Sequence, residues 1–136
     1  MKHVLCILAI GAATSSVPLF DQSRPDFSGT WAATDSLITI RQDGRVLTVH
    51  ERQDVLIYNL DGSESRFARG GTQYTARTRW VGNALVVTLT TEGAIGAWED
   101  LHVYSLDHGP KLNVVHVGTQ STRPMMFTQT KAYTRR

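Results

Sequence analysis

From residue 27 onward, apolar and polar residues alternate in short runs, and glycine, aspartate and asparagine separate the runs. This two-residue period is typical of β-strands with one buried face, and no stretch shows the period of a helix. The pattern predicts ten strands, at residues 27–34, 37–41, 45–51, 55–60, 63–68, 73–81, 84–91, 97–106, 112–118 and 125–135. The expected fold is all-β, an antiparallel up-and-down meander closed into a barrel of eight to ten strands, without a substantial helix.

The connections between the predicted strands alternate between tight and looser segments. The tight ones are the two-residue turns Asp43-Gly44, Asp61-Gly62 and Gly82-Asn83 and a slightly longer turn at 108–110. The looser ones lie at 34–36, 52–54, 69–72, 92–96 and 119–123. Because alternate connections of a meander lie at opposite ends, this order predicts a barrel with a closed floor and an open mouth.

Pairing across the tight turns collects apolar side chains on one face of the sheet, as a half-buried sheet requires. The predicted facing pairs are Ile40 with Leu47, Ile38 with Val49, Leu56 with Phe67, Trp80 with Leu85, and Thr78 with Val87. An even number of strands makes the last strand antiparallel to the first. Closure of the barrel would then remove both edges of the sheet.

The first sixteen residues have the composition of an export signal. Lys2 and His3 precede an apolar run at 4–13 that is too short to span a bilayer, and Ala13-Thr14-Ser15 is a small-residue cleavage site. We therefore expect a cleaved signal peptide at 1–16, an extended arm at 17–26 and one barrel domain at 27–136. The protein is expected to be secreted or periplasmic, and Cys6, the single cysteine, would leave with the signal.

The charge balance bears on binding to nucleic acid. Loss of Lys2 would leave 13 basic and 12 acidic side chains, an excess of one positive charge. Such a balance gives no case for nucleic acid. No second long apolar run follows, so we expect no integral membrane association.

Two short stretches resemble the calycin superfamily, the lipocalin-like β-barrels. These are Phe27-Ser28-Gly29-Thr30-Trp31 at the first strand and Arg135 at the end of the last. More narrowly, the stretches at 25–31, 60–64 and 79–87 resemble small exported bacterial lipocalin-like domains. The resemblance implies a structural floor in which Trp31 plugs the barrel, with Gly29 beside it and Arg135 across its ring. It also implies a lumen that carries a small apolar molecule.

Nine residues of the inferred inner face would form the wall of a ligand-binding lumen. They are Tyr58, Phe67, Tyr74, Trp80, Val87, Leu89, Trp98, Tyr104 and Phe127. The alternative is a filled core, because a small barrel can be plugged by its own side chains.

The sharpest polar constellation consists of Asp100, His102 and His116. If Leu106 pairs with Leu112, then His102 faces His116, and Asp100 lies two residues before His102 on the same face. Two imidazoles and a carboxylate would suit a divalent metal, haem iron or the polar group of a ligand. The alternative is a polar cross-strand pair, and we favour it, so no metal or other cofactor is expected.

The mouth of the predicted barrel carries Arg52, Arg69 and Arg123 beside several carboxylates. These arginines would capture an anionic head group of the ligand, or else belong to an ordinary charged surface. No motif of nucleophilic, phosphate-binding or zinc-dependent catalysis occurs in the sequence, so we do not expect an enzyme.

The sequence therefore favours an exported barrel that binds a small apolar molecule in its lumen. The alternative is a protein-interaction or structural accessory module with a filled barrel. An enzyme that uses His102 and His116 ranks third.

Overall fold

The computed structural model describes residues 24–93, 96–108, 110–120 and 123–136 of the chain. The predicted signal peptide and the arm up to residue 23 lie outside the described residues. The described strands are β1 (Gly29–Ala33), β2 (Ser36–Gln42), β3 (Val46–Glu51), β4 (Asp54–Asn59), β5 (Ser65–Arg69), β6 (Thr72–Val81), β7 (Ala84–Gly93), β8 (Gly96–Asp107), β9 (Lys111–Gln120) and β10 (Arg123–Arg135). Within those ranges no helix long and apolar enough to cross a membrane is found.

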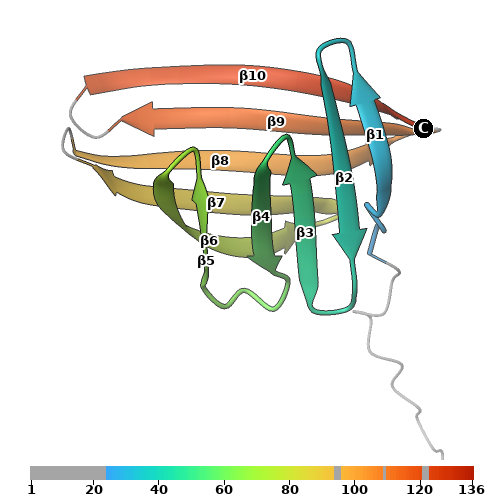
Figure 1. The fold of residues 1–136 in the computed structure, drawn as a ribbon, viewed down its shortest axis with the longest axis horizontal. Helices are drawn as coiled ribbons and strands as arrows, with labels where there is room; N and C mark the ends of the chain where they lie inside the picture. The colour runs from blue at the N-terminus through green and yellow to red at the C-terminus, as the bar shows by residue number, and fades with distance from the viewer. Residues whose placement is uncertain (1–23, 94–95, 109, 121–122) are drawn as a thin grey trace, which may run out of the picture.

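The ten strands form one antiparallel sheet in the order β4-β3-β2-β1-β10-β9-β8-β7-β6-β5. Strands that are neighbours in this order are also consecutive in sequence, except β1 and β10, which pair through Trp31 with Arg135 and Ala32 with Thr134. Figure 1 shows the short strands β1–β4 crossing the long strands β7–β10, which extend past them. The sheet thus curls into a nearly closed barrel, and the predicted all-β antiparallel meander is confirmed.

The sheet does not close completely, because β4 and β5 lie at its two ends and share no backbone ladder. Side chains bridge this seam instead. The Ser65 hydroxyl donates to the Ile57 carbonyl at 2.6 Å, and the Asn59 amide donates to the Glu64 carbonyl at 3.1 Å. The Thr78 hydroxyl on β6 donates to the Asn59 carbonyl at 2.5 Å. These bonds satisfy some of the backbone carbonyl groups at the seam, which would otherwise lack hydrogen-bond partners.

The predicted pairing of Leu56 with Phe67 is therefore wrong, as is the expectation that no sheet edge remains. The reason lies in the connection from β4 to β5, which spans residues 60–64 and is wider than the expected two-residue turn. Leu60 is buried, and its backbone N–H donates to the Arg45 carbonyl at 2.7 Å. This contact carries the chain toward the floor of the barrel before β5 begins.

Turn lengths also differ from the prediction at the mouth. Two-residue turns, not looser loops, join β1 to β2, β3 to β4 and β5 to β6. Arg52, Gly70 and Gly71 have φ values of 55°, 55° and 78°. Consecutive positive φ values, as at Gly70 and Gly71, are what a tight hairpin turn needs. The described mouth is thus bordered by short turns, while residues 94–95 and 121–122 lie outside the description.

At the floor, the turn after β2 is wider than predicted. The Asp43 carboxylate accepts hydrogen bonds from the backbone N–H groups of Arg45 and Val46, at 2.7 and 2.8 Å. These bonds stabilise a longer turn, so Ile40 faces Val49 instead of Leu47. The shift is two residues, and side chains alternate every residue. The same residues therefore still point into the barrel. The predicted registers of Trp80 with Leu85 and Thr78 with Val87 are confirmed.

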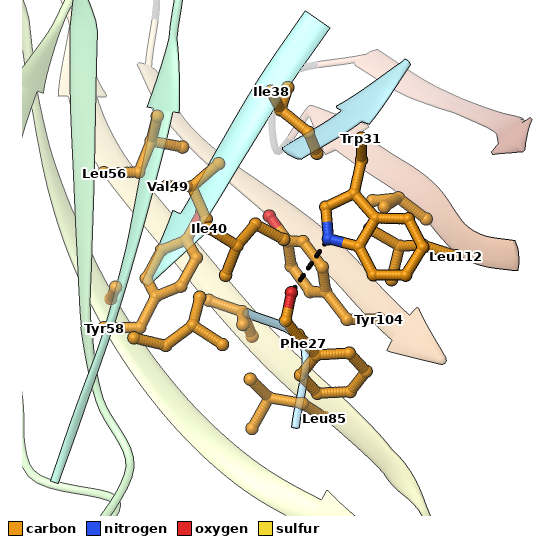
Figure 2. Close-up of a cluster of buried hydrophobic side chains, with 14 of the residues drawn as sticks. Phe27, Trp31, Ile38, Ile40, Val49, Leu56, Tyr58, Leu85, Tyr104 and Leu112 are labelled. Carbon is orange, nitrogen blue, oxygen red and sulfur yellow. Dashed lines mark hydrogen bonds between the residues drawn. The ribbon is translucent and has the colours of Figure 1, made fainter. Parts of the chain in front are cut away.

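The floor of the barrel is built around Trp31. Its buried ring donates through Nε1 to the Phe27 carbonyl at 2.8 Å, as Figure 2 shows. The Arg135 guanidinium lies over this ring at 4.4 Å from its centroid, and its Nη1 donates to the Ser28 carbonyl at 2.8 Å. Gly29 has a φ of 144°, and a Cβ there would lie 2.8 Å from Arg135 Nη1. Only glycine therefore leaves room for the arginine.

Candidate ligand pocket near the mouth of the barrel

Above the floor, the inside of the barrel holds a pocket of about 220 Å³. Its apolar wall is formed by Ile38, Val49, Leu56, Tyr104, Val114 and Tyr133. Its polar wall and rim are formed by Glu51, Arg69, His102, His116, Gln129 and Lys131. The alternation along β2, β3, β4, β8, β9 and β10 points these side chains inward. Glu51 and Arg69 end β3 and β5 at the mouth.

His102 and His116 form a stacked pair on the polar wall. They face each other across β8 and β9, the register that the sequence predicted. Their ring centroids lie 3.9 Å apart, with an angle of 17° between the ring planes. His102 is 4% exposed, and within the described residues its Nδ1 has no hydrogen-bond partner. The pair therefore presents unsatisfied hydrogen-bonding capacity inside the barrel.

Both imidazoles are held in the neutral form. Burial lowers the pKa of His102 to about 3, and the neighbouring His116 and Arg69 add to the effect. Burial also lowers the pKa of His116, and the positive charge of Arg69 is the second cause. A neutral imidazole both donates and accepts one hydrogen bond, so the pair can bind either kind of ligand group.

Asp100 lies two residues from His102 on the same face of β8. Burial raises the pKa of its carboxyl group, and its Oδ1 is buried without a hydrogen-bond partner in the described part of the chain. Asp100 does not line the pocket, although its charge acts on His116.

The geometry gives no support to a metal site. In the described ranges, no group of three or more histidine, cysteine, aspartate or glutamate side chains is arranged to hold a metal ion. The lone pair of an imidazole lies in the plane of its ring. Two stacked rings therefore direct their lone pairs along parallel planes and do not converge on one ion at the short distance that zinc requires.

Two ion pairs lie at the rim of the pocket. Arg69 Nη2 contacts Glu51 Oε2 at 3.1 Å, and both side chains are about one-third exposed or less. Lys131 Nζ contacts Asp35 Oδ1 at 2.9 Å, and Asp35 lies outside the pocket lining. Of the three arginines predicted at the mouth, Arg69 lines the pocket and Arg52 is exposed on a turn; the side chain of Arg123 is not described.

The structure places the nine residues predicted to line the lumen in different environments. Tyr58, Phe67, Val87 and Leu89 pack in the buried core, and Tyr74 and Trp80 pack at its margin. Tyr104 is the one that lines the pocket. Trp98 is half-buried, and Phe127 is 51% exposed. Most of the predicted lining residues therefore belong to the packed core, and the pocket beside the histidine pair is lined mainly by other residues.

Sequence reasoning missed four polar or amphipathic residues of the pocket, namely Glu51, Gln129, Lys131 and Tyr133. The two-residue alternation along the strands did indicate that these residues point inward. Glu51 follows the inward-facing Val49 by two residues, and the three β10 residues share the spacing of Phe127. The residues predicted for the lumen are mainly apolar and aromatic, although polar side chains also point inward near the mouth of a barrel.

No protein-family model matches the chain, and no curated protein matches it either.

Proposed function

We propose that the protein is an exported, lipocalin-like barrel that binds a small, largely apolar molecule in the pocket beside His102 and His116. The observation that carries this proposal is an open, mixed pocket above a closely packed core. Ligand sites in proteins commonly combine an apolar wall with a few polar groups that orient the ligand. Tyr104 adds one such group, because burial raises the pKa of its hydroxyl to about 12 and keeps it protonated.

The volume of the pocket limits the ligand. An apolar cavity of about 150 Å³ holds benzene. A pocket of about 220 Å³ therefore suits one aromatic ring with a short substituent, or an aliphatic molecule of similar size. Haem or a long-chain lipid would extend beyond it.

The test is a titration of the purified protein with indole, para-cresol and benzyl alcohol, followed by calorimetry and by chemical shifts of the pocket residues. We expect saturable one-site binding of at least one probe. Val114→Phe should fill the pocket and abolish this binding without unfolding the barrel. Thr130→Phe, on the exposed outer face of β10, is the matched control and should bind like the parent.

The alternative is a protein-interaction or structural module. It is favoured by the packed core of the barrel and by the exposure of Val55 and Ile57 on the outer face of β4. This alternative predicts that none of the three probes shows saturable binding. Binding that Val114→Phe leaves unchanged would also argue against the pocket as the site.

A further inference from the structure

We propose that the pocket selects a small organic anion, with its carboxylate at Arg69, Lys131 and His116 and its apolar body against Val49 and Val114. This inference rests on the proposed function, because it names the chemical class of the ligand for the same pocket.

The first argument is the charge of the pocket lining. Arg69 and Lys131 contribute two positive charges, and Glu51 contributes one negative charge. The two histidines that line the pocket are neutral, so the lining carries one net positive charge. The carboxylate that neutralises Lys131 belongs to Asp35, which lies outside the lining and is largely exposed to solvent. Solvent weakens that ion pair and leaves the inner side of Lys131 available.

The second argument is the number of unused donors. The Arg69 guanidinium has five N–H donors, and a single contact, from Nη2 to Glu51, engages it within the described residues. Lys131 has three donors, and its hydrogen-bonding contact there is with Asp35. A carboxylate has two oxygens that accept such bonds in a bidentate or bridging manner. The rim thus offers more donors than its own carboxylates consume.

The third argument is the convergence of these groups on His116. The charges of Arg69 and Lys131 both act to lower the pKa of His116, which places all three groups in one electrostatic environment. Both cations would attract an anion beside them, and the neutral His116 imidazole would donate an additional hydrogen bond to it. Glu51 and Asp100 act on His116 in the opposite sense, and His102 stacks on it.

The fourth argument is the size of the apolar wall. Val49, Leu56 and Val114 are buried and line the same pocket as the charged groups; Val114 is the cross-strand neighbour of Lys131. In a pocket of about 220 Å³, this wall accommodates one ring when the carboxylate reaches the rim. Benzoate is the simplest molecule with these properties, and benzyl alcohol is its uncharged counterpart of nearly equal size.

The experiment measures the affinities of benzoate and benzyl alcohol at pH 7 by calorimetry. We expect benzoate to bind about tenfold more tightly or better, because hydrogen bonds to charged groups are stronger than neutral ones. Arg69→Gln should weaken the binding of benzoate by about tenfold and the binding of benzyl alcohol by much less. Glu51→Gln should strengthen the binding of benzoate roughly threefold, because it removes the carboxylate that competes for Arg69. Arg77→Gln, which breaks an exposed ion pair with Glu64 outside the pocket, is the control and should change neither affinity.

A second readout does not depend on the variants folding. In the parent protein, saturating benzoate should raise the pKa of His116, followed by its imidazole carbon-bound proton signals, whereas benzyl alcohol should not. Equal affinities for the two probes, or an unmoved His116, would overturn the anion inference while leaving small-molecule binding intact. If neither probe binds, this inference is refuted; the proposed function is refuted as well only if indole and para-cresol also fail to bind.

Discussion

The buried neutral state of His102 makes the folded protein sensitive to mild acid. An unfolded histidine has a pKa of about 6.5, whereas burial lowers the pKa of folded His102 to about 3. Between these values the unfolded chain binds a proton that the folded protein excludes. Stability from this residue is therefore fully present above pH 6.5 and declines as the pH falls toward 3.

The size of the loss follows from the linkage between proton binding and folding. Lowering the pH from 7 to 5 should cost about 2 kcal/mol of unfolding free energy through His102 alone. At pH 5 the folded imidazole is still neutral, so the loss is governed by protonation of the unfolded chain. A domain of this size has roughly 5–15 kcal/mol of stability, so the effect is large enough to measure.

The perturbation is His102→Phe, which keeps an aromatic ring against His116 and removes the titrating group. Urea unfolding is followed at pH 7 and pH 5 through tryptophan fluorescence. We expect the loss of stability between these pH values to be smaller in His102→Phe than in the parent by about 2 kcal/mol. A residual dependence should remain, because burial also lowers the pKa of His116.

His50→Phe is the matched control, because His50 is exposed on the outer face of β3. It should keep the acid sensitivity of the parent. Measurements stay above pH 4.5, because Asp26, Asp43 and Asp61 have lowered pKa values through hydrogen bonds and lose stability only in stronger acid. Equal pH dependence in the parent and His102→Phe would refute the reasoning, since it would mean that folded His102 accepts protons as readily as the unfolded chain does.

Five further substitutions test three other features of the structure. Trp31→Ala should cost about 3–5 kcal/mol in urea unfolding. Arg135→Ala should cost less in that background than in the parent, so strictly additive losses would show that the two side chains do not interact. Gly118→Ala would place a Cβ against the ring of Phe127 and should destabilise the barrel by about 1–3 kcal/mol, a cost that Phe127→Ala should largely remove. Ser65→Ala deletes the buried hydroxyl that bridges the seam, and should cost about 1–2 kcal/mol and speed hydrogen exchange in β5; unchanged exchange would show that the bridge does not hold the seam.

The alternation of apolar and polar residues predicts the strands and their inward faces well, because burial of one sheet face imposes a two-residue period. It also brings His102 opposite His116, since the register of a hairpin depends on the short segment between its strands. The same alternation cannot show whether two consecutive strands share a hydrogen-bonded ladder or lie on either side of an unpaired seam. Leu56 and Phe67 point inward whether or not β4 and β5 share a ladder. The pattern of apolar and polar residues therefore cannot reveal that their predicted pairing is wrong.

The extent of the pocket also escapes the sequence pattern. The alternation of side chains along a strand predicts which residues point into the barrel. The volume left open there depends on how aromatic rings from distant strands pack. Tyr58 contacts Phe67 and Tyr104 at centroid distances of 5.8 and 6.1 Å, so these rings pack against one another inside the barrel. The space around the histidines remains open because shorter and polar side chains face it there.

The pairing of β1 with β10 bears on the speed of folding. Most ladders join strands that follow one another in the chain, whereas the contact from Arg135 to Ser28 spans 107 residues. Two local meanders, β1–β4 and β5–β10, therefore form without long loops, and only their joining at the floor requires a distant encounter. Because closing a long loop costs chain entropy before it yields contacts, we expect this encounter to limit the folding rate. The residues of the floor would then govern how fast the barrel forms as well as how firmly it stays closed.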